Sequence, residues 1–159
     1  MPFPRSGSIR PRTPKSWSNG DYAVTTDPAR VDLDVVHRFL SEESYWAAGR
    51  TREQQARANE LSACFTLLHE PTDKQVGFAR VLSDDVGFGW VADVFVSDGH
   101  RGRGLGVFLM QCVVESYEHL LPRLVLGTRD AHGVYEKVGF EPLSRVERWM
   151  ERWFLPPNP

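Results

Sequence analysis

The feature that most constrains the fold of this chain is a change of hydrophobic period near residue 100. From residue 63 to residue 96, apolar and polar side chains alternate over short segments, which is typical of strands. From residue 105, apolar side chains recur every three or four positions, which predicts an amphipathic helix ending near residue 119. A glycine-rich run, Arg-Gly-Arg-Gly-Leu-Gly at residues 101–106, joins the two patterns. The sequence therefore predicts a strand that enters a helix through a glycine-rich turn.

The remaining segments complete a mixed sheet. Three period-two segments joined by short turns predict an antiparallel meander, at residues 63–69, 75–82 and 86–96. A short strand at residues 124–126 and a helix at 131–138 follow the central helix, and this alternation predicts a parallel addition to the sheet. A strand at 22–26 and helices beginning after Asp32 and Thr51 come earlier. We expect an α/β (α+β) domain whose sheet is mostly antiparallel, with helices on both faces.

Length and charge limit the organisation and the partners. The 159 residues suit one domain, which we expect at residues 21–155, after a flexible basic tail at 1–20. That tail holds four basic and no acidic side chains, whereas the net charge of the chain is −2, so we expect no nucleic-acid partner. No apolar run approaches the roughly 20 residues of a membrane span, and no apolar run of a secretory signal precedes the domain. We expect a cytoplasmic protein without a membrane partner.

The two cysteines, Cys64 and Cys112, lie among apolar residues. Their spacing matches no metal motif, so we expect no metal site. Buried free thiols in a reducing compartment are the simplest interpretation.

The glycine-rich turn has the properties of an anion site. The first backbone N–H groups of a helix have no intrahelical partner, and the helix dipole places partial positive charge there. Glycines let phosphate oxygens approach those groups closely. A dinucleotide fingerprint would need a third glycine at Val107, and no Gly-Lys-Ser/Thr of a Walker A loop is present. Two other interpretations of residues 101–106 remain besides an anion site. The run is a turn that only connects strand to helix, or it is an RNA-binding Arg-Gly box.

Two motifs carry a resemblance to a known family. Arg101, Gly104 and Gly106 satisfy Gln/Arg-x-x-Gly-x-Gly/Ala, and residues 135–140 satisfy Tyr-x-x-x-Gly-Phe, with Ala131 four residues before the tyrosine. On these residues the sequence resembles the GNAT superfamily of N-acetyltransferases over most of its length. The resemblance implies acetyl-CoA as cosubstrate, lying in a splay between two central parallel strands, 86–96 and 124–126.

The resemblance also assigns the cofactor contacts. The backbone of Val94, Phe95 and Val96 would pair with the pantetheine amides. The amides of Gly102–Gly106 would hold the pyrophosphate, and either Arg101 or Arg103 would meet the 3′-phosphate. The expected cofactor-binding residues are Val94, Phe95, Val96, Arg101, Gly102, Arg103, Gly104, Leu105, Gly106 and Ala131.

Two residues are the candidates for catalysis. Tyr135 matches the position from which the family donates a proton or hydrogen bond to the departing sulfur; the alternative is a core tyrosine. Many relatives carry a glutamate base at the position of Ala92, and Asp93 lies beside it. A carboxylate among apolar strand residues is costly to bury unless it has a charged or hydrogen-bonding partner, so its presence indicates a structural or functional role. Asp93 has three candidate roles: a base acting through water, a site for a cationic acceptor, or a structural carboxylate at a backbone kink.

The acceptor site is the least specified part. The layout of the family places Glu43, Tyr45 and Trp46 in the acceptor wall, where carboxylates and aromatic rings suit an amine; the alternative is packing of a helix end on the sheet. Residues 145–154 predict a last strand or a helix, and their tryptophans are candidates for the opposite wall or for a homodimer interface.

The expected function is transfer of an acetyl group from acetyl-CoA to a primary amine, directly within a ternary complex. The alternative is a non-catalytic acyl-CoA sensor or interaction module of the same fold. Ala92 favours this alternative, and the retained Tyr135 opposes it.

Overall fold

The computed structural model describes residues 13–156, and its centre is a six-stranded sheet whose strands follow chain order. The strands are β1 (Ser16–Asn19), β2 (Tyr22–Thr25), β3 (Ala63–His69), β4 (Lys74–Ser83), β5 (Gly89–Val96) and β6 (Leu124–Val125). Every neighbouring pair is antiparallel except β5 and β6, which are parallel. The predicted meander and the parallel addition are confirmed.

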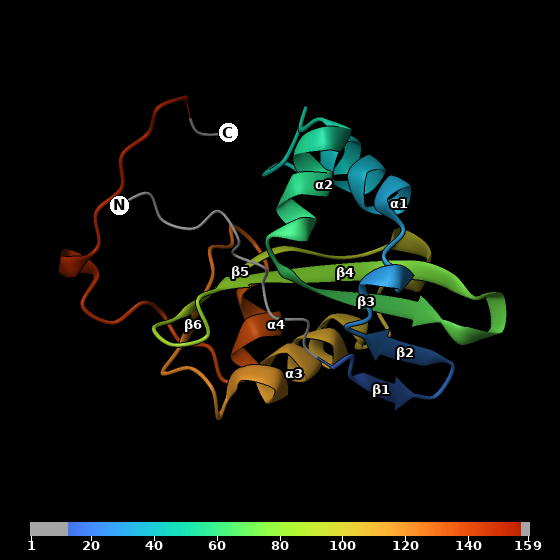
Figure 1. Cartoon of the computed structure of the whole chain (residues 1–159). Coiled ribbons are helices and arrows are strands. Elements are labelled where there is room, and N and C mark those ends of the chain that lie inside the picture. The colour runs from blue at the N-terminus through green and yellow to red at the C-terminus, as the bar shows by residue number, and fades with distance from the viewer. Residues whose placement is uncertain (1–12, 157–159) are drawn as a thin grey trace, which may run out of the picture.

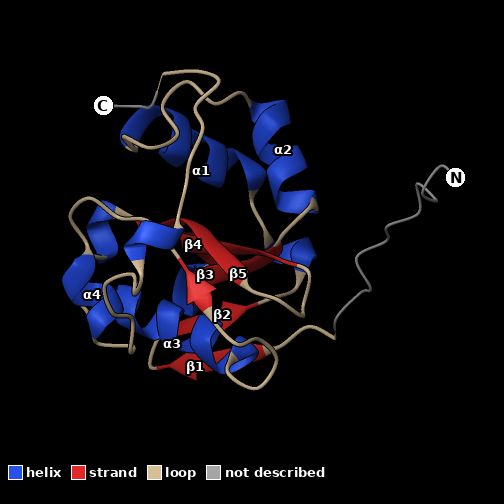
Figure 2. Cartoon of the chain, turned by 90° about the vertical axis from the view of Figure 1, so that its left-hand side faces the viewer, coloured by secondary structure: helices blue, strands red, loops and turns tan. Residues whose placement is uncertain are grey.

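Helices cover both faces of this sheet, as predicted (Figure 1). Helices α1 (Leu33–Arg38) and α2 (Arg52–Glu60) lie on one face, and α3 (Leu105–Tyr117) and α4 (His132–Glu136) lie on the other (Figure 2). A π-helix, η2 (Phe39–Glu43), continues α1. Short 3-10 segments occupy four connections: Pro28–Arg30, Glu70–Thr72, Asp98–His100 and Val146–Arg148.

Local capping explains where the first two helices begin. The Asp32 side chain accepts hydrogen bonds from the backbone N–H groups of Asp34 and Val35, which starts α1. Thr51 and Gln54 form the predicted capping box at the start of α2. These caps fix the segment between the two helices, which forms one wall of the site described below.

The core has one part on each face of the sheet. On the α3 face, Leu109 and Val113 are fully buried against strand residues that include Phe65. On the α1 face, Val36 and Leu40 are fully buried in a cluster with residues of β4 and β5. There, the rings of Phe39 and Phe95 stack with centroids 4.0 Å apart. This stacking fixes η2 directly over the C-terminal half of β5.

The two ends of the domain differ from expectation. β1 lies inside the segment expected to be a flexible tail at residues 1–20: Trp17 pairs with Val24 and stacks on Phe65 with centroids 6.2 Å apart. The fold therefore begins before residue 21, and residues 1–12 of the expected tail lie outside the described part of the chain. Residues 145–154 form neither a strand nor an α-helix and contain only the turn Val146–Arg148, so that expectation was wrong.

The start of β5 also differs from the sequence expectation. Strand pairing begins at Gly89 and not at residue 86, because the Asp84 side chain accepts the backbone N–H groups of Val86 and Gly87 and closes a tight turn. Within residues 13–156, no helix is long and apolar enough to cross a membrane.

Candidate active site

A splay between β5 and β6 opens the main cavity of the domain. The two strands pair only at Gly89 with Leu124 and at Trp90 with Val125. Beyond these pairs the strands separate, and residues 91–96 and 126–131 line a cavity of about 1060 Å³. The predicted splay between two central parallel strands is therefore present, and it is wide enough to hold an extended ligand.

The glycine-rich loop forms one end of this cavity. Gly102 and Gly104 have left-handed backbones, with φ of +73° and +74°. A Cβ on either glycine would meet nothing within 4 Å, so both residues face open space. The first intrahelical bond of α3 runs from Phe108 to the carbonyl of Gly104, and the three N–H groups before it have no helix partner. Open space beside free backbone donors fits a phosphate group.

The two arginines of the loop are placed differently. Arg101 lines the cavity, but its Nε donates to the carbonyl of Val96 (2.9 Å) and its Nη1 pairs with Asp98 (2.6 Å). Arg101 therefore ties the loop to the end of β5. Arg103 is exposed and is absent from the cavity lining. All of the other expected cofactor-binding residues line the cavity: Val94, Phe95, Val96, Arg101, Gly102, Gly104, Leu105, Gly106 and Ala131.

A β-bulge interrupts β5 where it borders the cavity. Phe95 pairs with Phe78 but Ala92 pairs with Arg80, so β5 carries one extra residue against β4. Asp93 lies in this bulge and has a left-handed backbone, with φ of +55°. A bulge leaves a backbone N–H group outside the ladder, where it can meet a ligand. The Asp93 side chain contacts Trp46 and Arg50, which lie between η2 and α2, and Arg80 of the neighbouring strand β4.

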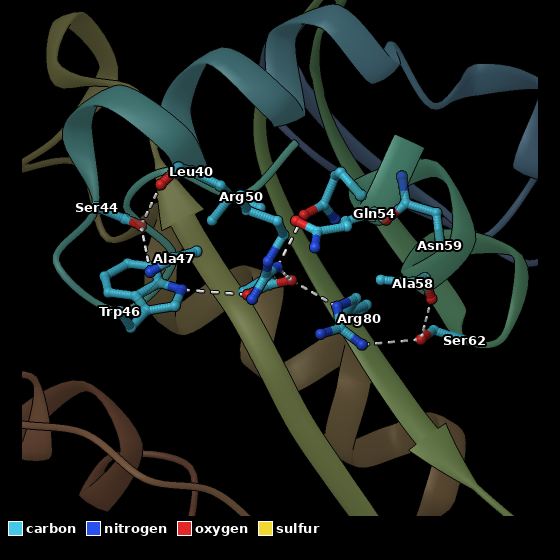
Figure 3. A network of polar contacts seen from close by, with 12 residues as sticks. Leu40, Ser44, Trp46, Ala47, Arg50, Gln54, Ala58, Asn59, Ser62 and Arg80 are labelled. Atoms are coloured by element: carbon cyan, nitrogen blue, oxygen red, sulfur yellow. Dashed lines mark hydrogen bonds and ion pairs between the residues drawn. The ribbon is translucent and has the colours of Figure 1, made fainter. Parts of the chain in front are cut away.

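Three donors hold the Asp93 carboxylate, and they belong to Trp46, Arg50 and Arg80, which Figure 3 labels. The Nε of Arg80 and the Nη1 of Arg50 each donate to Oδ2 at 2.6 Å, and the Trp46 indole N–H donates to Oδ1 at 3.2 Å. The Asp93 side chain is 1% exposed. Burial raises the pKa of this carboxyl, but the guanidiniums of Arg80 and Arg50 outweigh burial and hold the pKa below its ordinary value.

These contacts bear on the three roles considered for Asp93. A carboxylate that already accepts three hydrogen bonds and has a lowered pKa is a weak proton acceptor. Its charge also faces two arginines and not open space. The geometry favours a structural role: Asp93 lies at the kink in β5, and its carboxylate positions Arg50 and Arg80.

Further polar contacts anchor both arginines. Arg50 donates to the Gln55 side chain (2.8 Å), and its carbonyl contacts the imidazole of His37 (2.9 Å). Arg80 donates to the hydroxyl of Ser62 (3.1 Å). Sequence reasoning missed Arg50 and Arg80 as a unit. The available signal was Arg80 itself, a charged residue within an apolar strand and thus in need of a buried partner.

Tyr135 lies on α4 and lines the cavity. Its side chain is buried, and its ring meets Phe140 edge-on with centroids 5.9 Å apart. Burial, followed by the nearby Tyr45 and Asp130, raises the pKa of Tyr135 to about 12. The phenol thus stays protonated at neutral pH and keeps an O–H donor for a hydrogen bond. Within residues 13–156 its hydroxyl has no hydrogen-bond partner, so it is available to a ligand.

The expected acceptor residues Glu43, Tyr45 and Trp46 all line the same cavity. The Tyr45 hydroxyl accepts the backbone N–H of Arg129 (3.0 Å), and its ring meets Trp46 edge-on. Tyr45 therefore joins the segment after η2 to the segment after β6. Glu43 lies at the end of η2 and is exposed.

Comparison with known proteins identifies the family. Residues 33–140 match the Acetyltransferase (GNAT) family. This chain belongs to the GNAT family. A protein of Gibberella zeae named "putative acetyltransferase" is 29% identical over 148 residues, which cover 80% of this chain and 84% of that protein. Its similarity extends over most of both chains.

Solved structures agree with this GNAT assignment. A crystal structure from Xanthomonas campestris, described as a "putative acetyltransferase belonging to the GNAT family", is 39% identical, with a TM-score of 0.76 over 83% of this chain and 92% of that chain. Glucosamine-6-phosphate N-acetyltransferase from Arabidopsis thaliana shares the fold at 17% identity, with a TM-score of 0.55 over 90% and 99% of the two chains. GNAT acetyltransferases generally use acetyl-CoA as cosubstrate.

Proposed function

We propose that this GNAT acetyltransferase moves an acetyl group from acetyl-CoA to a primary amine, directly within a ternary complex. The observation that carries the proposal is that one cavity brings together the glycine loop, the β5 bulge and the Tyr135 side chain. These three features supply an anion site, a backbone donor and a phenolic donor. Family membership supports acetyl transfer, and the amine acceptor is our own inference.

The chemistry of the donor site supports acetyl-CoA as the cosubstrate. The backbone donors at the start of α3 would hold the pyrophosphate, and the open edge of β5 at Val94, Phe95 and Val96 would pair with the pantetheine amides. When bound, acetyl-CoA supplies an acetyl group activated as a thioester. Arg101 keeps the loop against β5 through its bond to the carbonyl of Val96.

During transfer an N–C bond forms and the C–S bond breaks. An N–H group at the bulge would stabilise negative charge on the carbonyl oxygen. The Tyr135 phenol would donate a hydrogen bond to the departing sulfur. Its pKa of about 12 lies above the ordinary thiol pKa of roughly 8.5, so complete proton transfer would be uphill by about 5 kcal/mol. We therefore assign Tyr135 hydrogen-bond donation to the thiolate and not complete proton transfer.

The acceptor must lose a proton before it attacks. An ordinary amine with a pKa near 10 is only about one part in a thousand neutral at pH 7. Because Asp93 is held by two arginines and has a lowered pKa, we assign the proton to solvent water in the cavity and not to this carboxylate. The overall reaction yields an amide, free coenzyme A and the released proton.

The test has two steps. Acetyl-CoA at 100-fold over its Kd is expected to stabilise the protein by about 2.7 kcal/mol, which raises Tm by on the order of 5–10 °C. A panel of primary amines is then assayed for release of free thiol. Stabilisation together with amine-dependent thiol release supports the proposal. Absence of any shift contradicts it, and a shift without thiol release favours the non-catalytic acyl-CoA sensor.

A further inference from the structure

A shallow surface depression, called the second cavity below, adjoins the main cavity on the side of α2 and is widely open to solvent. It measures about 540 Å³ and shares three lining residues with the main cavity: Trp46, Arg50 and Arg80. The rest of its lining is small or neutral, namely Ala47, Ala48, Gly49, Gln54 and Ala58. Arg50 and Arg80 are the only charged residues in this lining, which contains no carboxylate. Among the described residues, this cavity therefore presents positive charge alone.

The two guanidiniums still have hydrogen-bond donors to offer. Each guanidinium carries five N–H donors. Arg50 uses two of them, on Asp93 and Gln55, and Arg80 uses two, on Asp93 and Ser62. The other donors have no partner within residues 13–156. None is sealed from solvent, because the only buried side-chain polar atom without a partner in that part of the chain is the Thr66 hydroxyl.

The charges of the cluster formed by Asp93, Arg50 and Arg80 do not cancel. Asp93 neutralises one of the two guanidiniums, which leaves an excess positive charge beside a carboxylate that is 1% exposed. The side chains of Arg50 and Arg80 are only 23% and 10% exposed, so water screens them incompletely. An anion bound between them would be held by charge-assisted hydrogen bonds, for which the planar fork of arginine suits a carboxylate.

This cluster also lies next to the reacting centre. Asp93 is in the bulge of β5, and the arginines that flank it line both cavities. Trp46, whose indole N–H donates to Asp93, also lines both cavities. A ligand whose amine lies in the main cavity can therefore extend past Trp46 toward the guanidiniums.

We propose that the acceptor is an amine that also carries a carboxylate, and that Arg50 and Arg80 bind this carboxylate in the second cavity. The inference rests on the proposed function and names its substrate class. It assigns Asp93 a positioning role: this carboxylate holds the two guanidiniums in place, while their remaining donors face the acceptor.

The experiment compares amines matched in size that differ in the carboxylate. The probes are the ω-amino acids from glycine to 6-aminohexanoate, the common L-α-amino acids and 4-(aminomethyl)benzoate, each against its carboxamide. Free thiol release from acetyl-CoA gives kcat/KM, and thermal shift in the presence of coenzyme A gives binding without turnover. We expect at least one acid to exceed its carboxamide by about 10- to 100-fold in kcat/KM.

A matched pair of variants tests the assignment to Arg50. Arg50→Gln is expected to bring the acid-to-carboxamide ratio close to one, and Arg50→Lys to restore part of it, because lysine keeps the charge but not the fork. Arg57→Gln is the control, since Arg57 lies exposed on α2, pairs with Glu60 and lines neither cavity. The ratio compares two substrates on one variant, so a general loss of stability does not change it.

The outcomes separate this inference from the proposed function. Acids that are no better than their carboxamides in both turnover and thermal shift overturn the carboxylate proposal, even where other amines are acetylated. An acid preference that survives in Arg50→Gln overturns the assignment to this residue. Failure of acetyl-CoA itself to stabilise the wild-type protein contradicts the proposed function instead.

Discussion

Tyr45 and Arg129, which both line the candidate active-site cavity, hold two distant segments of the chain together. The Tyr45 hydroxyl accepts the backbone N–H of Arg129 at 3.0 Å, and the Arg129 guanidinium lies 3.7 Å from the centroid of the Tyr45 ring. Tyr45 follows η2, and Arg129 lies between β6 and α4. Residues that belong to opposite walls are thus joined by one hydrogen bond and one cation–π contact.

Removal of the hydroxyl in Tyr45→Phe is expected to loosen this contact without removing the ring. A net hydrogen bond is worth about 1 kcal/mol, so the amide of Arg129 should exchange its hydrogen about 3- to 10-fold faster. Hydrogen exchange followed by mass spectrometry or NMR measures this. Tyr22→Phe is the control, because it removes a hydroxyl that contacts His100 elsewhere. Unchanged exchange at Arg129 in Tyr45→Phe would show that the contact does not hold the two walls.

Replacement of Gly104 tests whether the left-handed backbone of this residue is needed for acetyl-CoA binding. Gly104→Ala places a Cβ on a residue with φ of +74°, which costs about 1–2 kcal/mol or forces the loop to a new conformation. Stabilisation by acetyl-CoA should therefore fall, with a loss of at least about tenfold in affinity. Gly133→Ala is the control: its φ is not positive, its Cβ would meet nothing within 4 Å, and Gly133 lines neither cavity. Equal affinities for the two variants would contradict this account.

The sequence predicts the local parts of this site better than the distant ones. The loop at residues 101–106 and the motif containing Tyr135 are short-range patterns, because the helix start and the turn need neighbouring residues only. The capping box at Thr51 is predicted for the same reason. The order of β3, β4 and β5 also followed from turn lengths, since short turns join antiparallel neighbours.

Contacts between distant residues were not predictable in this way. The ion pair between Arg50 and Asp93 joins positions 43 residues apart, and it depends on a bulge that no periodic pattern indicates. The sequence alone left Asp93 with three roles for this reason. The C-terminal residues 145–154 contain apolar side chains at spacings that fit a strand or a helix, yet they pair with no strand within residues 13–156.

Neutralisation of the buried carboxylate in Asp93→Asn is expected to destabilise the fold. The substitution leaves two poorly exposed guanidiniums without their counter-charge, which typically costs about 3–5 kcal/mol. Urea unfolding at pH 7 measures the loss. Asp34→Asn is the control, because its pair with Arg52 is exposed, and such pairs contribute about 0–1 kcal/mol. A cost for Asp93→Asn as small as that of Asp34→Asn would contradict the structural role.

The stability difference between the wild-type protein and Asp93→Asn is expected to depend on pH. The folded pKa of Asp93 is lowered, so its stabilisation is complete well above the ordinary value of 3.8 and is lost as the pH falls through the folded pKa. The difference in unfolding free energy between wild type and Asp93→Asn should therefore narrow as the pH is lowered from 7 toward about 3. A difference that stays constant over this range would show that the carboxylate charge is not what stabilises the cluster.

Tyr135→Phe removes one oxygen atom and keeps the ring against Phe140. Because the phenol is assigned to the departing sulfur and not to donor binding, the acetyl-CoA thermal shift should be retained while kcat falls by about 10- to 100-fold. Tyr117→Phe makes the same deletion in the core, outside both cavities, and controls for lost stability. Since the pKa of Tyr135 is raised to about 12, its hydroxyl stays protonated across the usable range, and the wild-type rate should show no decline near pH 10 from this group. Full turnover in Tyr135→Phe would remove Tyr135 from the mechanism and leave the departing thiolate to solvent.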